Sequence, residues 1–112
     1  MMELPLPIAE HNEALINLCE NYSVNKLYVF GSVARNEFNP KSSDIDLLVE
    51  LKPMPPIERG EKLMNLWDAF ENLFSRKVDL LTDQPIRNPY LRQSVEATKQ
   101  LIYDRERTEV PL

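Results

Sequence analysis

The sequence predicts a single α/β domain in which short apolar strands form a small sheet and amphipathic helices flank it. Two observations lead to this prediction. The chain has 112 residues, with 43% hydrophobic and 28% charged, which is the size and composition of one ordinary globular domain. Its segments also alternate between helical and extended patterns, in the order helix, strand, loop, strand, helix, strand, helix.

The expected strands are short segments rich in leucine, β-branched and aromatic residues. The first is KLYVF (26–30), which stops at Gly31. The second is DIDLLVEL (44–51), which begins with strict alternation and becomes continuously apolar. The third is RKVDLLT (76–82), and the connection of roughly two dozen residues before it is long enough for a helical crossover.

The expected helices carry apolar residues at intervals of three and four. The first covers 8–22, the second runs from 57 to 74, and the last runs from about 89 to 103. The aromatic stripe of the second helix is expected in the core and not at a cofactor. We therefore expect one domain over 1–112, with a charged tail at 104–112.

Charge and composition exclude several classes of function. A net charge of −5 and a pI near 4.9 argue against broad binding to nucleic acid or to anionic membranes. The single Cys19 excludes an internal disulfide, and the single His11 excludes a His-rich metal site. Cys19 is expected to be a core residue. No apolar run approaches the roughly 20 residues of a membrane helix, and no signal peptide is visible, so we expect a cytoplasmic protein.

A Gly-Ser pair follows the first strand and precedes a segment able to form a short helix. Glycine lets a backbone approach a ligand closely, and the N–H groups at a helix start favour phosphate oxygens. Ser32 adds a hydroxyl donor next to Gly31. From these residues alone, a phosphate-binding turn and an ordinary turn both remain open.

Three aspartates interrupt apolar strands. Asp44 and Asp46 leave the same face of an extended segment, with Cα atoms roughly 6.5 Å apart, and oxygen ligands of this kind suit Mg²⁺. Asp79 lies within the third strand, where aspartate is depleted. If the third strand lies beside the second, the three carboxylates form a cluster able to hold two metal ions. The alternatives are solvated aspartates at a strand end and an exposed aspartate on an edge strand.

The combination GSVARNEFNPKSSDIDLLVEL (31–51) followed by KVDLLT (77–82) resembles the minimal nucleotidyltransferases of the DNA polymerase beta superfamily. Their mark is Gly-Ser, a loop of about ten residues, Asp-x-Asp at a strand start and a third acid on a later strand. The segment NPYLRQSVEATKQLIYD (88–104) is similar to their last helix. The resemblance implies a nucleotidyltransferase fold, with a mixed sheet of three or four strands and about four helices. The loop 33–43 is one residue longer than usual, and Asn36 stands where the family usually has glycine.

The resemblance also implies roles for individual residues. Gly31 and Ser32 would hold the nucleotide phosphates. Asp44 and Asp46 would bind Mg²⁺, while Asp79 would complete the metal site on the acceptor side and help to deprotonate the incoming hydroxyl.

Further residues of the Gly-Ser segment and its loop are weaker candidates. Arg35 is either a phosphate contact or a solvated helix arginine. Lys41, Ser42 and Ser43 are expected to shape the loop first and to contact ligand second.

The function that the resemblance implies is Mg²⁺-dependent transfer of a nucleoside monophosphate to a hydroxyl of a partner protein. AMP from ATP is the expected donor group, and a HEPN-domain toxin is the expected partner, with this chain as its antitoxin. One alternative is a binding module that neutralises the toxin by occlusion. Another is a transferase that modifies a small molecule. The base preference, the acceptor residue and the oligomeric state, a homo-oligomer included, cannot be read from the sequence.

Overall fold

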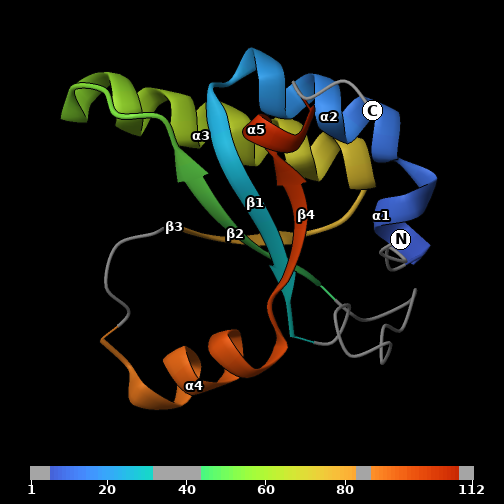
Figure 1. Cartoon of the computed structure of the whole chain (residues 1–112), viewed down its shortest axis with the longest axis vertical. Coiled ribbons are helices and arrows are strands. Elements are labelled where there is room, and N and C mark those ends of the chain that lie inside the picture. The colour runs from blue at the N-terminus through green and yellow to red at the C-terminus, as the bar shows by residue number, and fades with distance from the viewer. Residues whose placement is uncertain (1–5, 32–43, 83–86, 109–112) are drawn as a thin grey trace.

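The computed structural model describes residues 6–31, 44–82 and 87–108. Its elements in chain order are α1 (Leu6–Glu10), α2 (Asn12–Asn21), β1 (Val24–Phe30), β2 (Ile45–Leu51), α3 (Pro56–Phe74), β3 (Val78–Thr82), α4 (Pro89–Thr98), β4 (Gln100–Asp104) and α5 (Arg105–Thr108). The strands form one sheet in the order β3-β2-β1-β4 (Figure 1). This confirms the expected fold class, a mixed sheet flanked by helices.

The sheet is mixed because β1 runs antiparallel to both of its neighbours, whereas β2 and β3 are parallel. Parallel neighbours need a crossover, and α3 provides it between β2 and β3. Phe30 of β1 pairs with Asp46 of β2, which in turn pairs with Asp79 of β3. The end of β1, the start of β2 and the start of β3 therefore lie at one end of the sheet.

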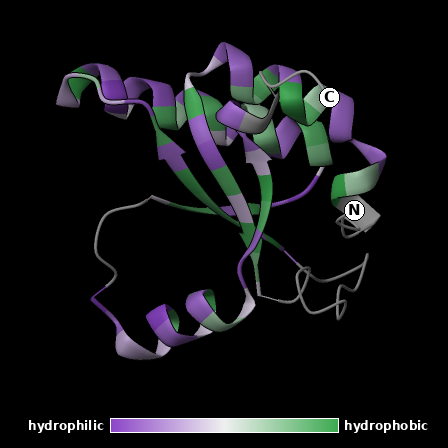
Figure 2. Ribbon diagram, in the orientation of Figure 1, coloured by the Kyte–Doolittle hydropathy of each residue, from purple (hydrophilic) through white to green (hydrophobic). Residues whose placement is uncertain are grey.

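The main core lies between the sheet and the helices α1, α2 and α3. On β2, Ile45, Leu47 and Val49 are fully buried and alternate with half-buried residues, as expected for a strand with one covered face. Figure 2 shows the apolar strands beneath helices of mixed hydropathy. The buried members of this cluster are Ile8, Leu15, Cys19, Val24, Leu27, Val29, Ile45, Leu47, Val49, Leu51, Leu66, Phe70, Phe74, Val78 and Tyr103.

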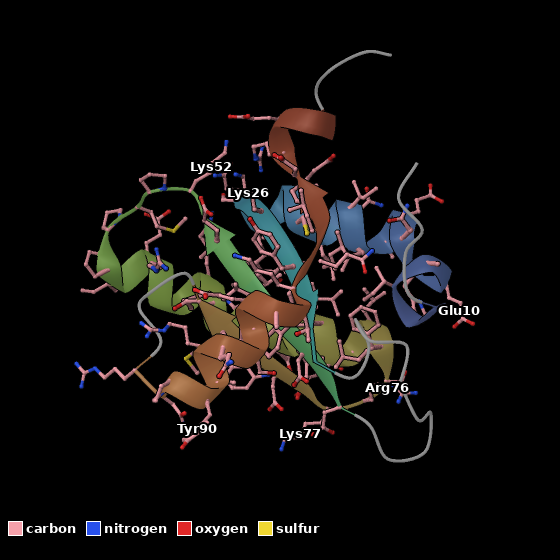
Figure 3. All side chains as sticks on the ribbon, turned by 60° about the horizontal axis from the view of Figure 1, so that its bottom comes forward. Glu10, Lys26, Lys52, Arg76, Lys77 and Tyr90 are labelled. Atoms are coloured by element: carbon pink, nitrogen blue, oxygen red, sulfur yellow. The ribbon has the colours of Figure 1, made fainter. Side chains whose placement is uncertain are left out.

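The opposite face of the sheet is met by α4. This helix contacts β1, and Figure 3 shows it in front of the strands, with α2 and α3 behind them. Phe30 and Val95 are buried but lie outside the main cluster, as expected for a smaller contact on the second face. The Lys99 amine lies 5.2 Å from the centre of the Tyr28 ring, which adds a cation–π contact on this face.

The first predicted helix is two helices in the structure. α1 ends at Glu10 and α2 begins at Asn12, with His11 between them in a non-helical conformation. The ring of His11 packs edge-on against Phe74, with ring centres 5.5 Å apart. The turn thus keeps both helices on the core while the imidazole covers the end of α3.

The prediction for the C-terminal part of the chain was wrong. The helix predicted to run to about residue 103 ends at Thr98 as α4, and the segment 100–104 continues as β4, paired with β1. Arg105 follows in α5 and donates from Nε to the carbonyl oxygen of Val24 at 3.2 Å, so this part of the expected tail belongs to the fold. Pairing with a neighbouring strand overrode the local helical spacing of Leu101 and Ile102. In the described part of the chain, no helix has both the length and the apolarity needed to cross a membrane.

Candidate active site

The three sequence-predicted acids lie on one face of the sheet. Asp46 and Asp79 are partners in the parallel register of β2 and β3, and neighbouring strands lie about 4.8 Å apart. Ile45 and Val78, the preceding pair in the register, are fully buried on the core face. Alternation therefore directs Asp44, Asp46 and Asp79 to the opposite face. The expectation that the third strand lies beside the second is confirmed.

Gly31 lies directly against the Asp46 carboxylate. Its φ is +71°, in the left-handed region that side chains rarely adopt. A Cβ placed on Gly31 would lie 2.5 Å from Oδ2 of Asp46, much closer than two such atoms can approach. Only glycine therefore fits at the end of β1 while Asp46 keeps this position.

Thr98, at the last turn of α4, fixes the amide of Gly31. The Gly31 N–H donates to the Thr98 hydroxyl at 3.0 Å, and that hydroxyl donates to the Ser94 carbonyl oxygen at 2.6 Å. The Gly31 amide is thus already bonded within the protein. Sequence reasoning missed Thr98, which it counted only as a member of the apolar face of a helix.

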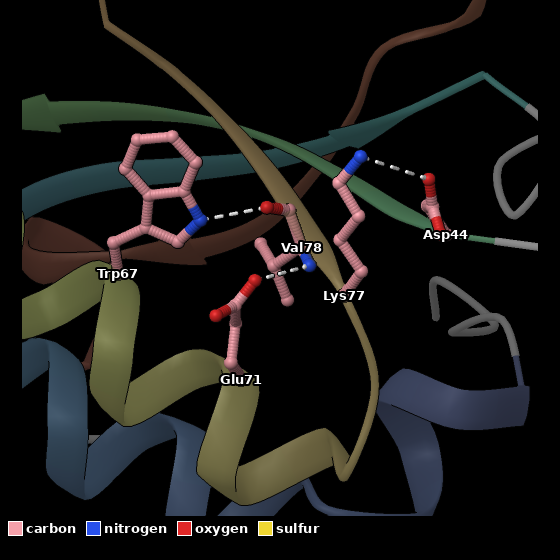
Figure 4. A network of polar contacts seen from close by, with 5 residues as sticks. All are labelled: Asp44, Trp67, Glu71, Lys77 and Val78. Carbon is pink, nitrogen blue, oxygen red and sulfur yellow. Dashed lines mark hydrogen bonds and ion pairs between the residues drawn. The ribbon is translucent and has the colours of Figure 1, made fainter.

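Lys77 is a second residue that sequence reasoning missed. It precedes Val78, so alternation places it on the same face as Asp79. The Lys77 amine lies 4.0 Å from a carboxylate oxygen of Asp44 (Figure 4). The Lys77 side chain is 68% exposed and the Asp44 side chain is 42% exposed. A solvated pair at this distance contributes little stability, but it places one positive charge beside the acids. The segment RKVDLLT could have predicted this placement, since Lys77 and Asp79 are two residues apart in a strand.

The edge strand β3 is held by side chains from α3. The Trp67 Nε1–H donates to the Val78 carbonyl oxygen at 2.6 Å, and the Val78 N–H donates to Oε2 of Glu71 at 3.1 Å. Figure 4 shows both contacts on the side of β3 that faces away from β2. An edge strand leaves these backbone groups without a strand partner, and here α3 satisfies them. Because Val78 is fixed in this way, so is the backbone that carries Asp79.

The donor chemistry of the three acids fits a hard divalent cation, because Mg²⁺ prefers carboxylate oxygens. Within the ranges that the structure describes, no three Asp, Glu, His or Cys side chains converge closely enough to hold a metal ion by themselves. Asp44 extends toward Lys77, and the Asp46 carboxylate lies against Gly31. Like charges on neighbouring strands repel each other. The three carboxylates would need a change of side-chain rotamer to bind one metal ion together.

Other candidates are either outside the described ranges or belong to the core. Ser32 and Arg35 lie outside the described residues, as do the loop residues Asn36, Lys41, Ser42 and Ser43. Cys19 is fully buried, and burial raises the pKa of its thiol from 9.0 to about 12. This confirms that Cys19 is a core residue, and its burial disfavours the thiolate.

A surface hollow borders α4, the helix that holds Gly31 through Thr98. Its described lining consists of Pro89, Arg92, Gln93, Glu96 and Ala97. The hollow combines a guanidinium, a carboxylate and an amide on one helix face.

Comparison with known proteins gives a consistent result. Residues 12–102 match the family model of the nucleotidyltransferase domain. A relative from Methanocaldococcus jannaschii, provisionally named a protein adenylyltransferase, is 43% identical over 86 residues, which cover 77% of this chain and 82% of the relative. A solved structure provisionally described as a minimal nucleotidyltransferase has a TM-score of 0.66 and 27% identity, and the match covers 98% of this chain and 97% of that chain.

A more distant likeness concerns the fold alone. It is to a solved complex of a tri-AMPylated HEPN toxin with an MNT antitoxin from Shewanella oneidensis. The TM-score is 0.53 at 20% identity, and the match covers 90% of this chain and 76% of that chain.

Proposed function

Because the chain belongs to the nucleotidyltransferase domain family, we propose that it transfers AMP from ATP to a hydroxyl of a partner protein in the presence of Mg²⁺. We further propose that the partner is a HEPN-domain toxin and that this chain is its antitoxin. The relatives named as protein adenylyltransferases support a protein as the acceptor. The complex of an AMPylated HEPN toxin supports the kind of partner.

The observation that carries the proposal is the register of the acids. Asp46 pairs with Asp79 across β2 and β3, and the Asp46 carboxylate lies against the backbone of Gly31. An acidic pair on rigid strands is thereby placed beside the glycine that follows β1. In transfer of a phosphoryl-type group, positioning and electrostatic stabilisation supply most of the catalysis, so rigid placement is the relevant property.

The proposed reaction is a displacement at the α-phosphorus of ATP. The acceptor hydroxyl oxygen forms a bond to this phosphorus, while the bond from the phosphorus to the oxygen that bridges to the β-phosphate breaks. Pyrophosphate leaves, and the hydroxyl proton passes to the Asp79 carboxylate. The products are an AMP ester of the partner and pyrophosphate, so no oxidant or further reactant is needed.

The side chains have distinct proposed tasks. Asp44, Asp46 and Asp79 would hold Mg²⁺, which when bound neutralises phosphate charge and stabilises the attacking and leaving oxygens. Gly31 would let the triphosphate approach the end of β1. Ser32 and Arg35 remain proposed phosphate contacts.

The decisive experiment replaces the first acidic pair. The double substitution Asp44→Asn and Asp46→Asn removes two carboxylates and keeps their shape. With α-labelled ATP, Mg²⁺ and a candidate HEPN-domain partner protein, we expect transfer to fall by at least about a hundredfold. Mass spectrometry of the partner should detect an added AMP for the unchanged chain and none for the variant.

A matched control separates local chemistry from net charge. Glu13 and Glu20 are exposed on α2, on the other side of the sheet, and changing both to Gln removes the same two charges. This control should transfer AMP at the normal rate. Undiminished transfer by the Asp44→Asn, Asp46→Asn protein would show that the chemistry lies elsewhere. If that variant loses transfer but still suppresses the toxin, neutralisation occurs by occlusion.

A further inference from the structure

We propose that the outer face of α3 is a docking surface for a basic amphipathic helix of the partner protein. The surface consists of Ile57, Gly60, Met64 and Trp67, flanked by Glu61 and Asp68, and is called the α3 surface below. The inference does not depend on nucleotide transfer, because a protein that binds its partner without modifying it would need the same surface.

The first observation is the exposure of large apolar side chains. Ile57 is 81% exposed, Met64 is 73% exposed and Trp67 is 42% exposed. Leu66, Phe70 and Phe74 of the same helix are buried in the core. The helix is therefore apolar on two sides, whereas a helix that only covers a sheet is expected to be polar on its outer side.

The second observation is the spacing of the exposed positions. Ile57, Gly60, Met64 and Trp67 follow one another at intervals of three, four and three residues, which is the spacing of a seam between two packed helices. The seam spans about 15 Å along the helix axis, or about three turns. A partner helix of similar length would cover it.

The third observation is the glycine within this seam. A Cβ on Gly60 would meet nothing within 4 Å, so no contact with the residues that the structure describes requires a glycine there. Glycine inside a helix is unfavourable by roughly 1 kcal/mol relative to alanine. On an outer face it leaves room for the backbone of another helix to approach closely, as small residues do in packed helices.

Charge identifies the occupant. The exposed charged residues of α3 are Glu58, Glu61 and Asp68, all acidic. The two basic residues of α3, Arg59 and Lys62, are half-buried. The Lys62 amine donates to the Ser23 hydroxyl at 2.8 Å, so it points back toward the sheet. A second copy of this chain would bring acid against acid across an antiparallel seam. A partner helix with Lys or Arg beside its apolar stripe is complementary.

The α3 surface is also connected to the candidate active site. The Trp67 indole is part of the surface, and its N–H holds the Val78 carbonyl oxygen, one residue before Asp79. The surface borders β3, the edge strand of the sheet. Asp79 lies on this strand, and it shares with Asp44 and Asp46 the sheet face that is turned away from the core. A partner bound there could reach the acids by passing around one strand.

The test uses the intrinsic fluorescence of the full chain without ATP. Trp67 is the sole tryptophan, so its emission reports directly on the α3 surface. The probe is a synthetic three-heptad helical peptide with leucine at the seam positions and lysine beside them. We expect the peptide to shift the Trp67 emission to shorter wavelength with saturable binding. A peptide with glutamate in place of each lysine should leave the emission unchanged.

Two variants locate the binding. Met64→Glu places a carboxylate in the seam and should weaken binding of the lysine peptide by about tenfold or more. Tyr90→Glu makes the same charge change at a residue that is 83% exposed on α4, and it should leave binding unaltered. Figure 3 shows Tyr90 projecting from that helix, away from α3. Gly60→Gln should raise the unfolding temperature yet weaken binding, because it improves the helix while filling the seam.

Several results would overturn the proposal. One is an emission of Trp67 that does not respond to the lysine peptide. A second is equal weakening by Met64→Glu and Tyr90→Glu, which would indicate binding through net charge alone. A third is a dimer in sedimentation that Met64→Glu dissociates, since the occupant would then be a second copy of the chain. Loss of AMP transfer with unchanged peptide binding would contradict only the proposed function.

Discussion

Replacing Gly31 with alanine tests the geometry of the candidate site more directly than replacing an acid. Two effects add up in the folded state. A non-glycine residue in the left-handed region costs about 1 to 2 kcal/mol. The new Cβ would also lie 2.5 Å from Oδ2 of Asp46, and displacing that carboxylate into a poorer rotamer costs about 0.5 to 1.5 kcal/mol. We therefore expect Gly31→Ala to lower the free energy of unfolding by about 1.5 to 3.5 kcal/mol.

The loss of activity should be larger than the loss of stability suggests. The atom nearest to the new Cβ is the end of the Asp46 side chain, and the Cγ and Cβ of Asp46 lie farther away, at 3.5 and 3.7 Å. The carboxylate can rotate aside, so the domain still folds. The group that moves is the proposed metal ligand, so AMP transfer should be lost in a protein that remains folded.

The only other glycine in the chain provides the control. Gly60 lies within α3, and a Cβ there would contact nothing within 4 Å. Gly60→Ala should therefore raise the free energy of unfolding by up to about 1 kcal/mol through helix propensity. The same chemical change is expected to have opposite signs at the two positions.

Urea unfolding followed by the emission of Trp67 measures both variants. For a chain of this size, the free energy changes by roughly 1 to 2 kcal/mol per molar urea, so Gly31→Ala should lower the midpoint by about 1 to 3 M. An unchanged midpoint would show that Gly31 does not adopt the left-handed conformation against Asp46. A lowered midpoint with full AMP transfer would show that the position of the Asp46 carboxylate is unimportant for the chemistry.

Three further predictions concern Thr98, Trp67 and Cys19. Thr98→Val leaves the Gly31 N–H without its acceptor and should destabilise the domain by about 1 to 3 kcal/mol in urea unfolding, whereas Thr98→Ser should retain most of the stability. Trp67→Phe removes only the donor to the Val78 carbonyl and should cost about 0.5 to 1.5 kcal/mol, with a lower rate of AMP transfer at saturating partner. Burial raises the pKa of Cys19 to about 12, so above about pH 9 the unfolded chain loses its thiol proton while the native chain keeps it. The free energy of unfolding therefore falls between about pH 9 and pH 12, by up to about 1.4 kcal/mol per pH unit. Cys19→Ala should lose less stability than the unchanged chain between pH 8 and about pH 10, and native Cys19 should resist thiol reagents that label it readily in urea.

The relation among the three acids could be predicted because it depends on rules that act along short segments. Alternation fixes the face of Asp44 and Asp46 as soon as DIDLLVEL is assigned to a strand. The same rule fixes the face of Asp79 within VDLL. One long-range fact was needed, the adjacency of β2 and β3, and strands joined by a single helical crossover are commonly neighbours.

The surroundings of the acids could not be predicted in the same way. Gly31 and Thr98 are 67 residues apart, and no local pattern distinguishes a threonine that accepts a hydrogen bond from one that only covers a core. β4 was missed for a related reason. The spacing of Val95, Leu101 and Ile102 is compatible with a helix, and only pairing with β1 shows that the last two belong to a strand.

The helix α3 links the two proposals. β3 is an edge strand with β2 as its single strand neighbour, so its position depends on what holds its free side. Trp67 and Glu71 hold that side at Val78, and Trp67 also belongs to the α3 surface. A helix docked there would restrict the Trp67 side chain and thereby the strand that carries Asp79. If both proposals hold, the strand that carries Asp79 is held most firmly when the protein to be modified is already bound.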